Sequence, residues 1–366
     1  MSVLQKPSCS LGSKKAFFMH NWRCAGTTMN SLLSSNFGDL YCKIGTQFSD
    51  FGWPLYELPE KLTLQDVRNS VQGGGVLGGH LCSGIQTFVA GEWDVWLNAR
   101  KPLKRLSSGI IRFHAKRFRM PSGQYPVDVV RSHSEKILNE LIDGPLRHER
   151  NGVTKRLAGF SVLDAIHLQP QTNLETLSCF EYFGTQNSLL EAAEQNIDNV
   201  KILILSEHLH ASLICIEKIY NLTPIINLFS NLKHNQAVLG KASNAEKKAF
   251  ELAKPSLEKL CSQDERLWLS LLEKFQIQLS NCSISKREIA VREALHSTQI
   301  LKPAFFKESV EPIHLIEHIA TRLANVAKDY SEISKDVVDT ATRWSRFHPH
   351  AAKEIRERAM HQLHLS

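Results

Sequence analysis

Residues 16–33 of this 366-residue chain read AFFMHNWRCAGTTMNSLL. The first four residues are apolar and suit a short buried strand, and Met29, Leu32 and Leu33 recur at helical spacing after a turn of small residues. A strand, a tight turn and a helix in this order leave unpaired amide groups at the helix N-terminus, where the helix dipole also favours an anion. The stretch therefore predicts a phosphate cradle, with an ordinary strand-to-helix connection as the alternative.

This cradle differs from the usual nucleoside triphosphate loop. That loop needs Gly-Lys-Ser/Thr, whereas Ala25–Gly26–Thr27 has no lysine before the hydroxyl. The sequence therefore lacks the main feature that would support magnesium-dependent phosphoryl transfer. A small-molecule kinase built on the same fold stays open as an alternative.

A second basic element follows another short apolar stretch. Trp93–Leu97 reads WDVWL, and residues 98–108 read NARKPLKRLSS. An arginine at the end of a strand offers two parallel donors to a phosphate, and a serine eight residues later, on the next helix, adds a hydroxyl. Arg100 and Ser108 are therefore candidate phosphate ligands. The alternative is that Arg100 and Arg105 belong to a solvated basic helix face.

Taken together, the two elements resemble those of sulfotransferases that use 3′-phosphoadenosine 5′-phosphosulfate (PAPS). In the glycan-sulfating branch of that family the first element commonly reads H-x-P-K-T-G-G-T-S/T, and here the match is aligned on His20. The resemblance implies that a loop binds the 5′-phosphosulfate through Arg23, Cys24, Ala25, Gly26, Thr27 and Thr28. The second element resembles R-d-P-x-x-R-x-x-S, which implies that Arg100 and Ser108 bind the 3′-phosphate.

The first element departs from the family pattern at two positions. Trp22 replaces the proline and Arg23 replaces the lysine. Arginine keeps the positive charge but presents a planar fork instead of a compact ammonium group. Arg23 is still expected to act in catalysis by offsetting charge on the leaving group, although a degenerate relative that binds nucleotide without turnover is an open alternative.

A glycine-rich segment between the two elements supplies the candidate base. Residues 73–81 read GGGVLGGHL and resemble the strand-and-histidine segment of glycan 2-O- and 6-O-type sulfotransferases, in which histidine is the catalytic base. A histidine that titrates near neutrality suits removal of the acceptor hydroxyl proton. We therefore expect His80 to be the base, with His20, Glu92 and Asp94 as alternatives, and a flexible glycine loop without a catalytic role is the other interpretation.

The rest of the chain completes the expected fold. Leu189–Leu222 reads as helix, strand and helix, and resembles the family segment in which Glu207 would hold a loop or a basic partner. The expectation is an α/β fold with a P-loop-like central parallel sheet flanked by helices. Residues 14–281 would form the sulfotransferase-like catalytic domain, and residues 282–366 a helical C-terminal extension that packs on the core or forms a homodimer.

Composition narrows the class of protein. A net charge of +7, 42% hydrophobic residues and 22% charged residues are ordinary for a globular protein. No segment approaches the roughly 20 apolar residues of a membrane span, and residues 1–13 lack a signal-peptide pattern, so a cytoplasmic protein without a membrane span is expected. The basic residues 100–119 could guide an acidic glycan or form a solvated face, and the absence of a recognition motif argues against nucleic acid.

The eight cysteines are scattered, with no C-x-x-C pair and no zinc-ligand spacing. Free thiols, no disulfide framework and no metal site are therefore expected. Cys24 is the exception, because its place beside Arg23 and a helix N-terminus predicts a lowered thiol pKa.

The function expected from the sequence is transfer of a sulfuryl group from PAPS to a hydroxyl of an acceptor, most naturally a carbohydrate. A small-molecule kinase and a non-catalytic polyanion-binding relative are the alternatives.

Overall fold

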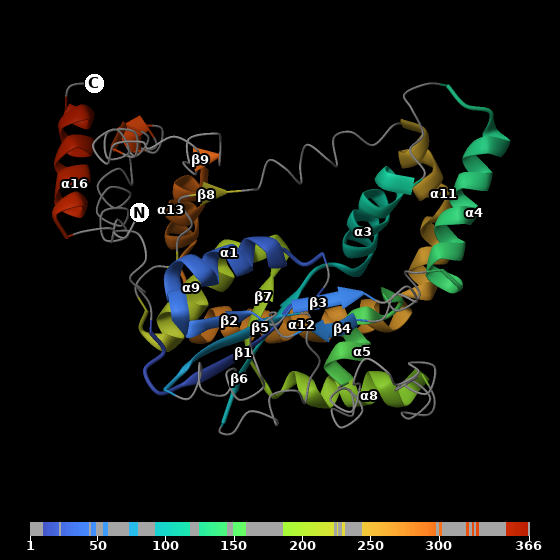
Figure 1. Ribbon diagram of the computed structural model, residues 1–366, viewed down its shortest axis with the longest axis horizontal. Helices are drawn as coiled ribbons and strands as arrows, with labels where there is room; N and C mark the ends of the chain where they lie inside the picture. Colours follow the sequence, from blue (N-terminus) through green and yellow to red (C-terminus); the bar gives the residue numbers. More distant parts are fainter. Residues whose placement is uncertain are drawn as a thin grey trace.

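The computed structural model describes residues 10–21, 23–43, 45–48, 54–57, 73–79, 92–117, 124–144, 149–158, 186–222, 225, 229–230, 244–297, 300–301, 320–321, 324–325, 327–328 and 349–364. Within these residues the fold is α/β, built on a five-stranded parallel sheet (Figure 1).

The strand order of the main sheet is β2-β5-β1-β6-β7, and every neighbouring pair is parallel. Its strands are β1 (Lys15–Met19), β2 (Tyr41–Lys43), β5 (Gly75–Gly79), β6 (Asp94–Ala99) and β7 (Val200–Leu205). Two short pairs are separate from it: β3 (Gly45–Phe48) with β4 (Pro54–Glu57), and β8 (Phe229–Ser230) with β9 (Ile300–Leu301). The apolar stretches that predict strands near residues 16, 94 and 200 are therefore confirmed as β1, β6 and β7.

The described α-helices are α1 (Gly26–Phe37), α3 (Pro102–Arg117), α4 (Val127–Ile142), α5 (Gly152–Ala158), α8 (Gln186–Ile197), α9 (Leu209–Tyr220), α11 (Asn244–Leu260), α12 (Ser262–Asn281), α13 (Lys286–Ser297) and α16 (Pro349–His364). Two 3₁₀ turns, η2 (Gly38–Leu40) and η6 (Ser206–His208), follow α1 and β7. No helix in these described ranges is both long and apolar enough to cross a membrane.

Helices cover both faces of the sheet. Along β1 the side chains alternate, so Phe18 faces one side and Phe17 the other. The Phe18 side packs against α1 and α9, and the Phe17 side packs against α5, α8 and α12. Burial on both faces explains why these strands are almost continuously apolar.

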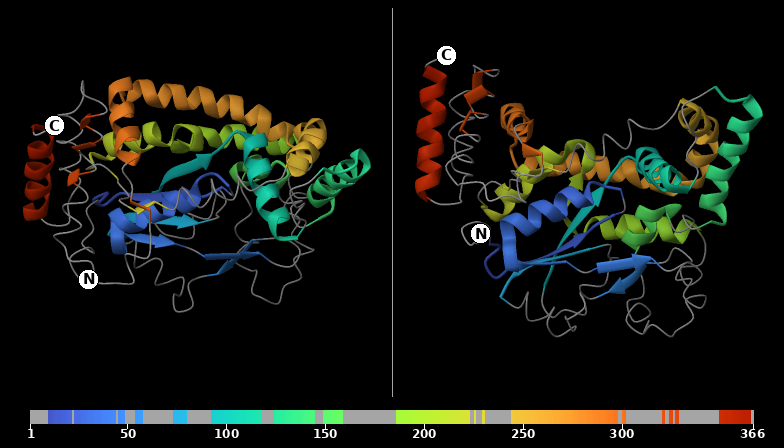
Figure 2. Two further views of the ribbon diagram at one scale, coloured as in Figure 1. Left: turned by 90° about the horizontal axis from the view of Figure 1, so that it is seen from above. Right: turned by 45° about the horizontal axis from the view of Figure 1, so that its top comes forward.

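A second group of helices forms its own core. Apolar residues of α3, α4 and α11 pack together, including Leu106, Ile137 and Ala249. Figures 1 and 2 show these three helices at one end of the molecule, with α16 at the other end. Helix α3 connects this group to the sheet, since it begins three residues after β6 ends.

Strand register brings the predicted binding elements to one edge. Met19, the last residue of β1, pairs with Leu97 near the end of β6. The backbone N–H of His20 then donates to the carbonyl of Gly79, at 2.8 Å, at the end of β5. Because the strands are parallel, the loops that follow β1 and β6 leave the same carboxyl edge of the sheet, where ligands bind in open α/β sheets.

A fully buried ion network fixes α3 on the rest of the molecule. Arg105 pairs with the Glu149 carboxylate and, at 3.0 Å, with that of Asp264 on α12. Glu149 also pairs with Arg156, at 2.6 Å, and Asp264 accepts both the N–H and the hydroxyl of Thr154 on α5 at 2.8 Å. Burial by itself lowers the pKa of Arg105, but the carboxylates of Glu149 and Asp264 raise it overall, so the guanidinium stays charged.

The structure thereby corrects the interpretation of Arg105. It is 0% exposed, so it belongs neither to a solvated basic face nor to a surface that contacts a cofactor. Arg105 stands at the second arginine of the R-d-P-x-x-R-x-x-S pattern, and in this protein that arginine makes a buried structural ion pair. Ser108 follows it by less than one helical turn, so the network also fixes where Ser108 lies.

Replacing Asp264 with asparagine tests the network. Asp264→Asn removes a charge but keeps the size of the side chain, and it leaves buried Arg105 with one carboxylate partner. The free energy of unfolding, measured by urea titration, should fall by about 3–5 kcal/mol.

The matched control is Asp198→Asn, which changes an exposed aspartate and should stay within about 0.5 kcal/mol of the parent protein. Equal effects of the two substitutions would contradict the structural role of the network.

Candidate functional site

The loop between β1 and α1 has an unusual backbone. Arg23 and Ala25 have φ angles of 62° and 59°, in the left-handed region that residues other than glycine seldom adopt. Ala25 is the N-cap of α1, and no side chain caps the first turn. The helix therefore begins with backbone N–H groups that have no partner within the helix, at the positive end of its dipole.

The two phosphate-binding elements predicted from the sequence contact each other here. Arg23 donates from Nε and Nη2 to the hydroxyl of Ser108 on α3, at 3.2 and 2.9 Å. Arg100 donates from Nη1 to the backbone carbonyl of Arg23, at 3.4 Å. Residues that are 85 positions apart in the sequence thus form one polar cluster at the carboxyl ends of β1 and β6.

Glu207 adds a carboxylate to this cluster. It follows β7 in η6, and its Oε1 lies 3.9 Å from Nε of Arg100 and accepts the backbone N–H of Lys101 at 3.3 Å. Glu207 thus contacts both a basic side chain and the backbone of the following loop, the two kinds of partner that the resemblance implies for it. Arg100 keeps 27% of its side chain exposed, so its guanidinium is accessible from solvent.

His20 packs beneath the start of α1. Its ring is stacked on Phe18 with centroids 6.0 Å apart, and the residue is 8% exposed. A Cβ atom at Gly26 would lie 1.4 Å from Nε2 of His20, so only glycine fits there. This packing gives His20 a role in fixing the conformation of the loop.

The prediction of a lowered pKa for Cys24 is wrong. The side chain is fully buried, and burial raises the pKa of the thiol to about 12. Arg105 and Arg100 act in the opposite direction, but their effect is smaller than the desolvation of a thiolate. Cys24 therefore shapes the loop as a small apolar side chain, and its backbone N–H donates to the carbonyl of Asn21 at 3.3 Å.

The remaining residues of the predicted cradle lie where the helix starts. Gly26 is the first residue of α1, and Thr27 and Thr28 follow in its first turn. The side chain of Thr27 is outside the described residues, as is the whole of His80. The assignment of His80 as the base therefore stays a prediction.

The alternative carboxylate bases are not brought to this site. Asp94 begins β6, so it lies at the amino edge of the sheet, and Glu92 precedes it. Asp94 and Ala99 are the first and last of the six residues of β6, about 16 Å apart. Asp94 instead accepts a hydrogen bond from the hydroxyl of Tyr220, at 2.8 Å.

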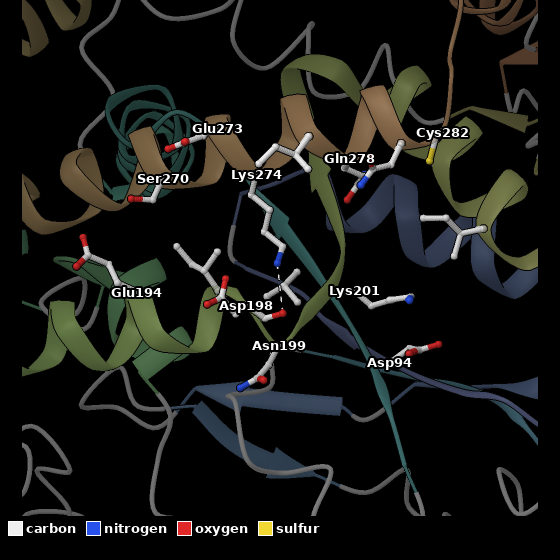
Figure 3. Close-up of a pocket in the computed structure, with 15 residues that line it drawn as sticks. Asp94, Glu194, Asp198, Asn199, Lys201, Ser270, Glu273, Lys274, Gln278 and Cys282 are labelled. Atoms are coloured by element: carbon white, nitrogen blue, oxygen red, sulfur yellow. Dashed lines mark hydrogen bonds between the residues drawn. The ribbon is translucent and has the colours of Figure 1, made fainter.

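A cavity of about 880 Å³ lies at this amino edge (Figure 3). Side chains of α8, β7 and α12 line it, and Nζ of Lys274 donates to the carbonyl of Asp198 at 3.3 Å. Its charged lining residues are Asp94, Glu194, Asp198, Lys201, Glu273 and Lys274. The lining carries both signs of charge and includes none of the predicted phosphate ligands. Because the cavity lies at the opposite edge of the sheet, it is separate from the candidate site.

The sequence analysis missed two residues of the site, Asn21 and Asn98. Both are 0% exposed and bond each other across the ends of β1 and β6. The available signal was an asparagine at the end of each of two apolar strands. Among the described residues, no group of three His, Cys, Asp or Glu side chains could hold a metal ion.

Comparison with known proteins adds no assignment. No protein-family model matches the chain, and no curated protein matches it. A function for this protein must therefore be argued from the residues of the site.

Gly26→Ala tests the packing of the cradle. The new methyl group would overlap His20, whose ring is held by Phe18, so overpacking should lower stability by about 1–3 kcal/mol. The loss should be seen as a lower melting temperature.

Two further variants make this result specific. His20→Ala should restore part of the lost stability when combined with Gly26→Ala, because it removes the clashing ring. Gly73→Ala, at a position with no atom within 4 Å of a new Cβ, should be neutral. Additive losses in the double variant would contradict the clash.

Proposed function

We propose that this protein is a sulfotransferase that moves a sulfuryl group from PAPS to a hydroxyl of an acceptor, with a carbohydrate as the acceptor class. The observation that carries the proposal is the contact of Arg23 with Ser108 and Arg100. Two sequence elements that resemble the 5′-phosphosulfate and 3′-phosphate elements of that family meet at the carboxyl edge of a parallel sheet. If the resemblance of either element were accidental, there would be no reason for the two elements to contact each other.

The chemistry of the donors fits a nucleotide with two separate anionic groups. The amides at the start of α1 and the Arg23 guanidinium would hold the 5′-phosphosulfate, with Thr27 and Thr28 beside them. Arg100 and Ser108 would hold the 3′-phosphate. The Ser108 hydroxyl accepts from Arg23 and still has its own proton to donate to a phosphate oxygen. When bound, PAPS supplies the sulfuryl group that the reaction transfers.

The residues of the chain would then act in two ways. Arg23 and the helix amides offset negative charge that develops on the leaving phosphate, in a site whose positive groups are already in place. His80 removes the proton of the acceptor hydroxyl. Protein cations do the neutralising in this scheme, which is why the proposal assigns no metal ion to it.

Several features of the chain belong to the same proposal. The sheet would be of the P-loop-like type, with the cradle following its central strand β1. Residues 282–366 would form a helical extension of the catalytic domain at 14–281 and could support a homodimer. A cytoplasmic location is also part of the proposal.

Ligand preference tests the proposed function directly. 3′-Phosphoadenosine 5′-phosphate, measured without magnesium, should raise the melting temperature more than ADP or ATP does. A ligand at 100 times its Kd contributes about 2.7 kcal/mol of stability, which is a measurable shift. Equal or greater stabilisation by magnesium-ATP would favour the kinase alternative.

Arg100→Ala then identifies the 3′-phosphate ligand. The variant should bind 3′-phosphoadenosine 5′-phosphate more weakly by about 2–3 kcal/mol, in line with loss of a charged hydrogen bond, and should bind ADP almost unchanged. Lys104→Ala, at an exposed lysine in the first turn of α3, is the matched control and should change neither. Equal weakening of both nucleotides would rule out the 3′-phosphate assignment.

His80→Ala separates catalysis from binding. Turnover should fall by about 10²–10⁴-fold, the usual contribution of a general base, while nucleotide affinity stays near that of the parent protein. Sulfation is measured as transfer of labelled sulfate to a panel of glycans. Preserved turnover would move the search to His20.

A further inference from the structure

Asn98 is the residue of the site with the most connections to the loop. Its Oδ1 accepts the backbone N–H of Asn21 at 2.5 Å, and its Nδ2 donates to the backbone carbonyl of Cys24 at 2.6 Å. Its own carbonyl accepts Nδ2 of Asn21 at 2.6 Å. One strand residue thus bonds the loop at both of its ends.

The position of Asn98 in the strand explains how it reaches the loop. Trp96 faces the side of the sheet that α1 covers, and alternation along β6 puts Asn98 on that same side. Because β6 extends beyond the last residue of β1, Asn98 lies next to the point where the chain leaves β1. A buried amide there is costly unless it is bonded, and here both groups of its side chain are used.

The loop needs such a restraint. Arg23 and Ala25 are held in left-handed conformations that cost free energy in residues with a Cβ. The Asn98 contacts bracket Arg23, since they bind residues 21 and 24. We propose that Asn98 is a positioning residue for anion binding: it locks the loop in the conformation that presents Arg23 and the α1 amides to a ligand. The inference rests on the proposed function, because it assumes that this loop binds an anion.

Asn98→Asp is the sharpest test. The carboxylate can still accept the Asn21 N–H, but its second oxygen faces the Cys24 carbonyl with no proton between them. The charged groups that act on neighbouring Cys24 are Arg105 on α3, Arg100 after β6, Glu149 before α5 and Arg156 on α5, and Arg23 and Glu207 contact Arg100 in the same cluster. Asn98 is 0% exposed, so burial raises the pKa of a carboxyl group placed there, and the facing Cys24 carbonyl also favours the protonated form, whereas the arginines lower the pKa. The arginines stay charged between pH 5 and 8, and His20 on the same loop is present in both proteins, so a pH dependence relative to the parent protein reports the new carboxyl group.

The affinity of the variant should therefore depend on pH. At pH 8, binding of 3′-phosphoadenosine 5′-phosphate and of inorganic sulfate should be weaker than in the parent protein by about tenfold, the equivalent of one hydrogen bond. At pH 5 the protonated aspartic acid can donate to the Cys24 carbonyl, and the deficit relative to the parent at that pH should shrink to about twofold. A residue needed only for folding would not produce this recovery.

Asn196→Asp is the matched control. Asn196 on α8 also donates from Nδ2 to a backbone carbonyl, that of Leu157, at 2.9 Å, but it lies outside the loop contacts. Its substitution should leave both affinities near the parent values at each pH. A pH-dependent loss of the same size in Asn196→Asp would overturn the proposal.

Cys24 provides a readout that needs no ligand. Its buried thiol should resist alkylation in the native parent protein and in Asn196→Asp, and should react in Asn98→Asp at pH 8, as followed by peptide mass spectrometry. Protection of Cys24 in Asn98→Asp, or reaction of Cys24 with unchanged affinity, would overturn the proposal. If the parent protein binds neither ligand, the proposed function fails, and the alkylation result alone still decides whether Asn98 locks the loop.

A second variant covers the case in which Asn98→Asp does not fold. Asn98→Ser is smaller and uncharged, and its hydroxyl is too short to bond both Asn21 and Cys24. It should label at Cys24 and bind both ligands more weakly at every pH. Parent-like protection and affinity in Asn98→Ser would overturn the proposal.

Discussion

The buried pairing of Arg105 with Glu149 and Asp264 is the interaction on which the site depends. It joins α3, α5 and α12, three helices that start from different parts of the chain. A buried charge requires its ion-pair partners at fixed positions, because the loss of one partner leaves an uncompensated buried ion. The consequence is that α3 has one position on the sheet, and Ser108 meets Arg23 there.

A second set of contacts restrains the loop after β1. Hydrogen bonds from β6 hold it at residues 21 and 24, and the imidazole of His20 fills the space beneath Gly26. These contacts explain how two residues with a Cβ can keep positive φ angles. A rigid loop of this kind binds an anion with little reorganisation, since its amides are oriented before the ligand arrives.

Electrostatics at this edge favour anions without creating a reactive thiol. Arg23 and Arg100 supply positive charge at the surface, and Glu207 in η6 pairs with Arg100. Cys24 lies in the same field, yet it is too deeply buried for the cations to overcome desolvation. Burial, more than distance from the arginines, therefore decides the charge state of the Cys24 thiol.

The sequence by itself determined the strands β1, β6 and β7 and the turn of small residues that leads into α1. Apolar runs and small-residue turns are local signals, so β1, α1, β6 and β7 could be predicted from them. It could not assign Arg105, because a solvated arginine and a buried one have the same local pattern and differ only in what packs against them. Nor could it find Asn98 or exclude Asp94. Which strand ends share an edge, and which carboxylates lie at the other, follows from sheet order and register, and these are set by long-range packing that only the tertiary structure decides.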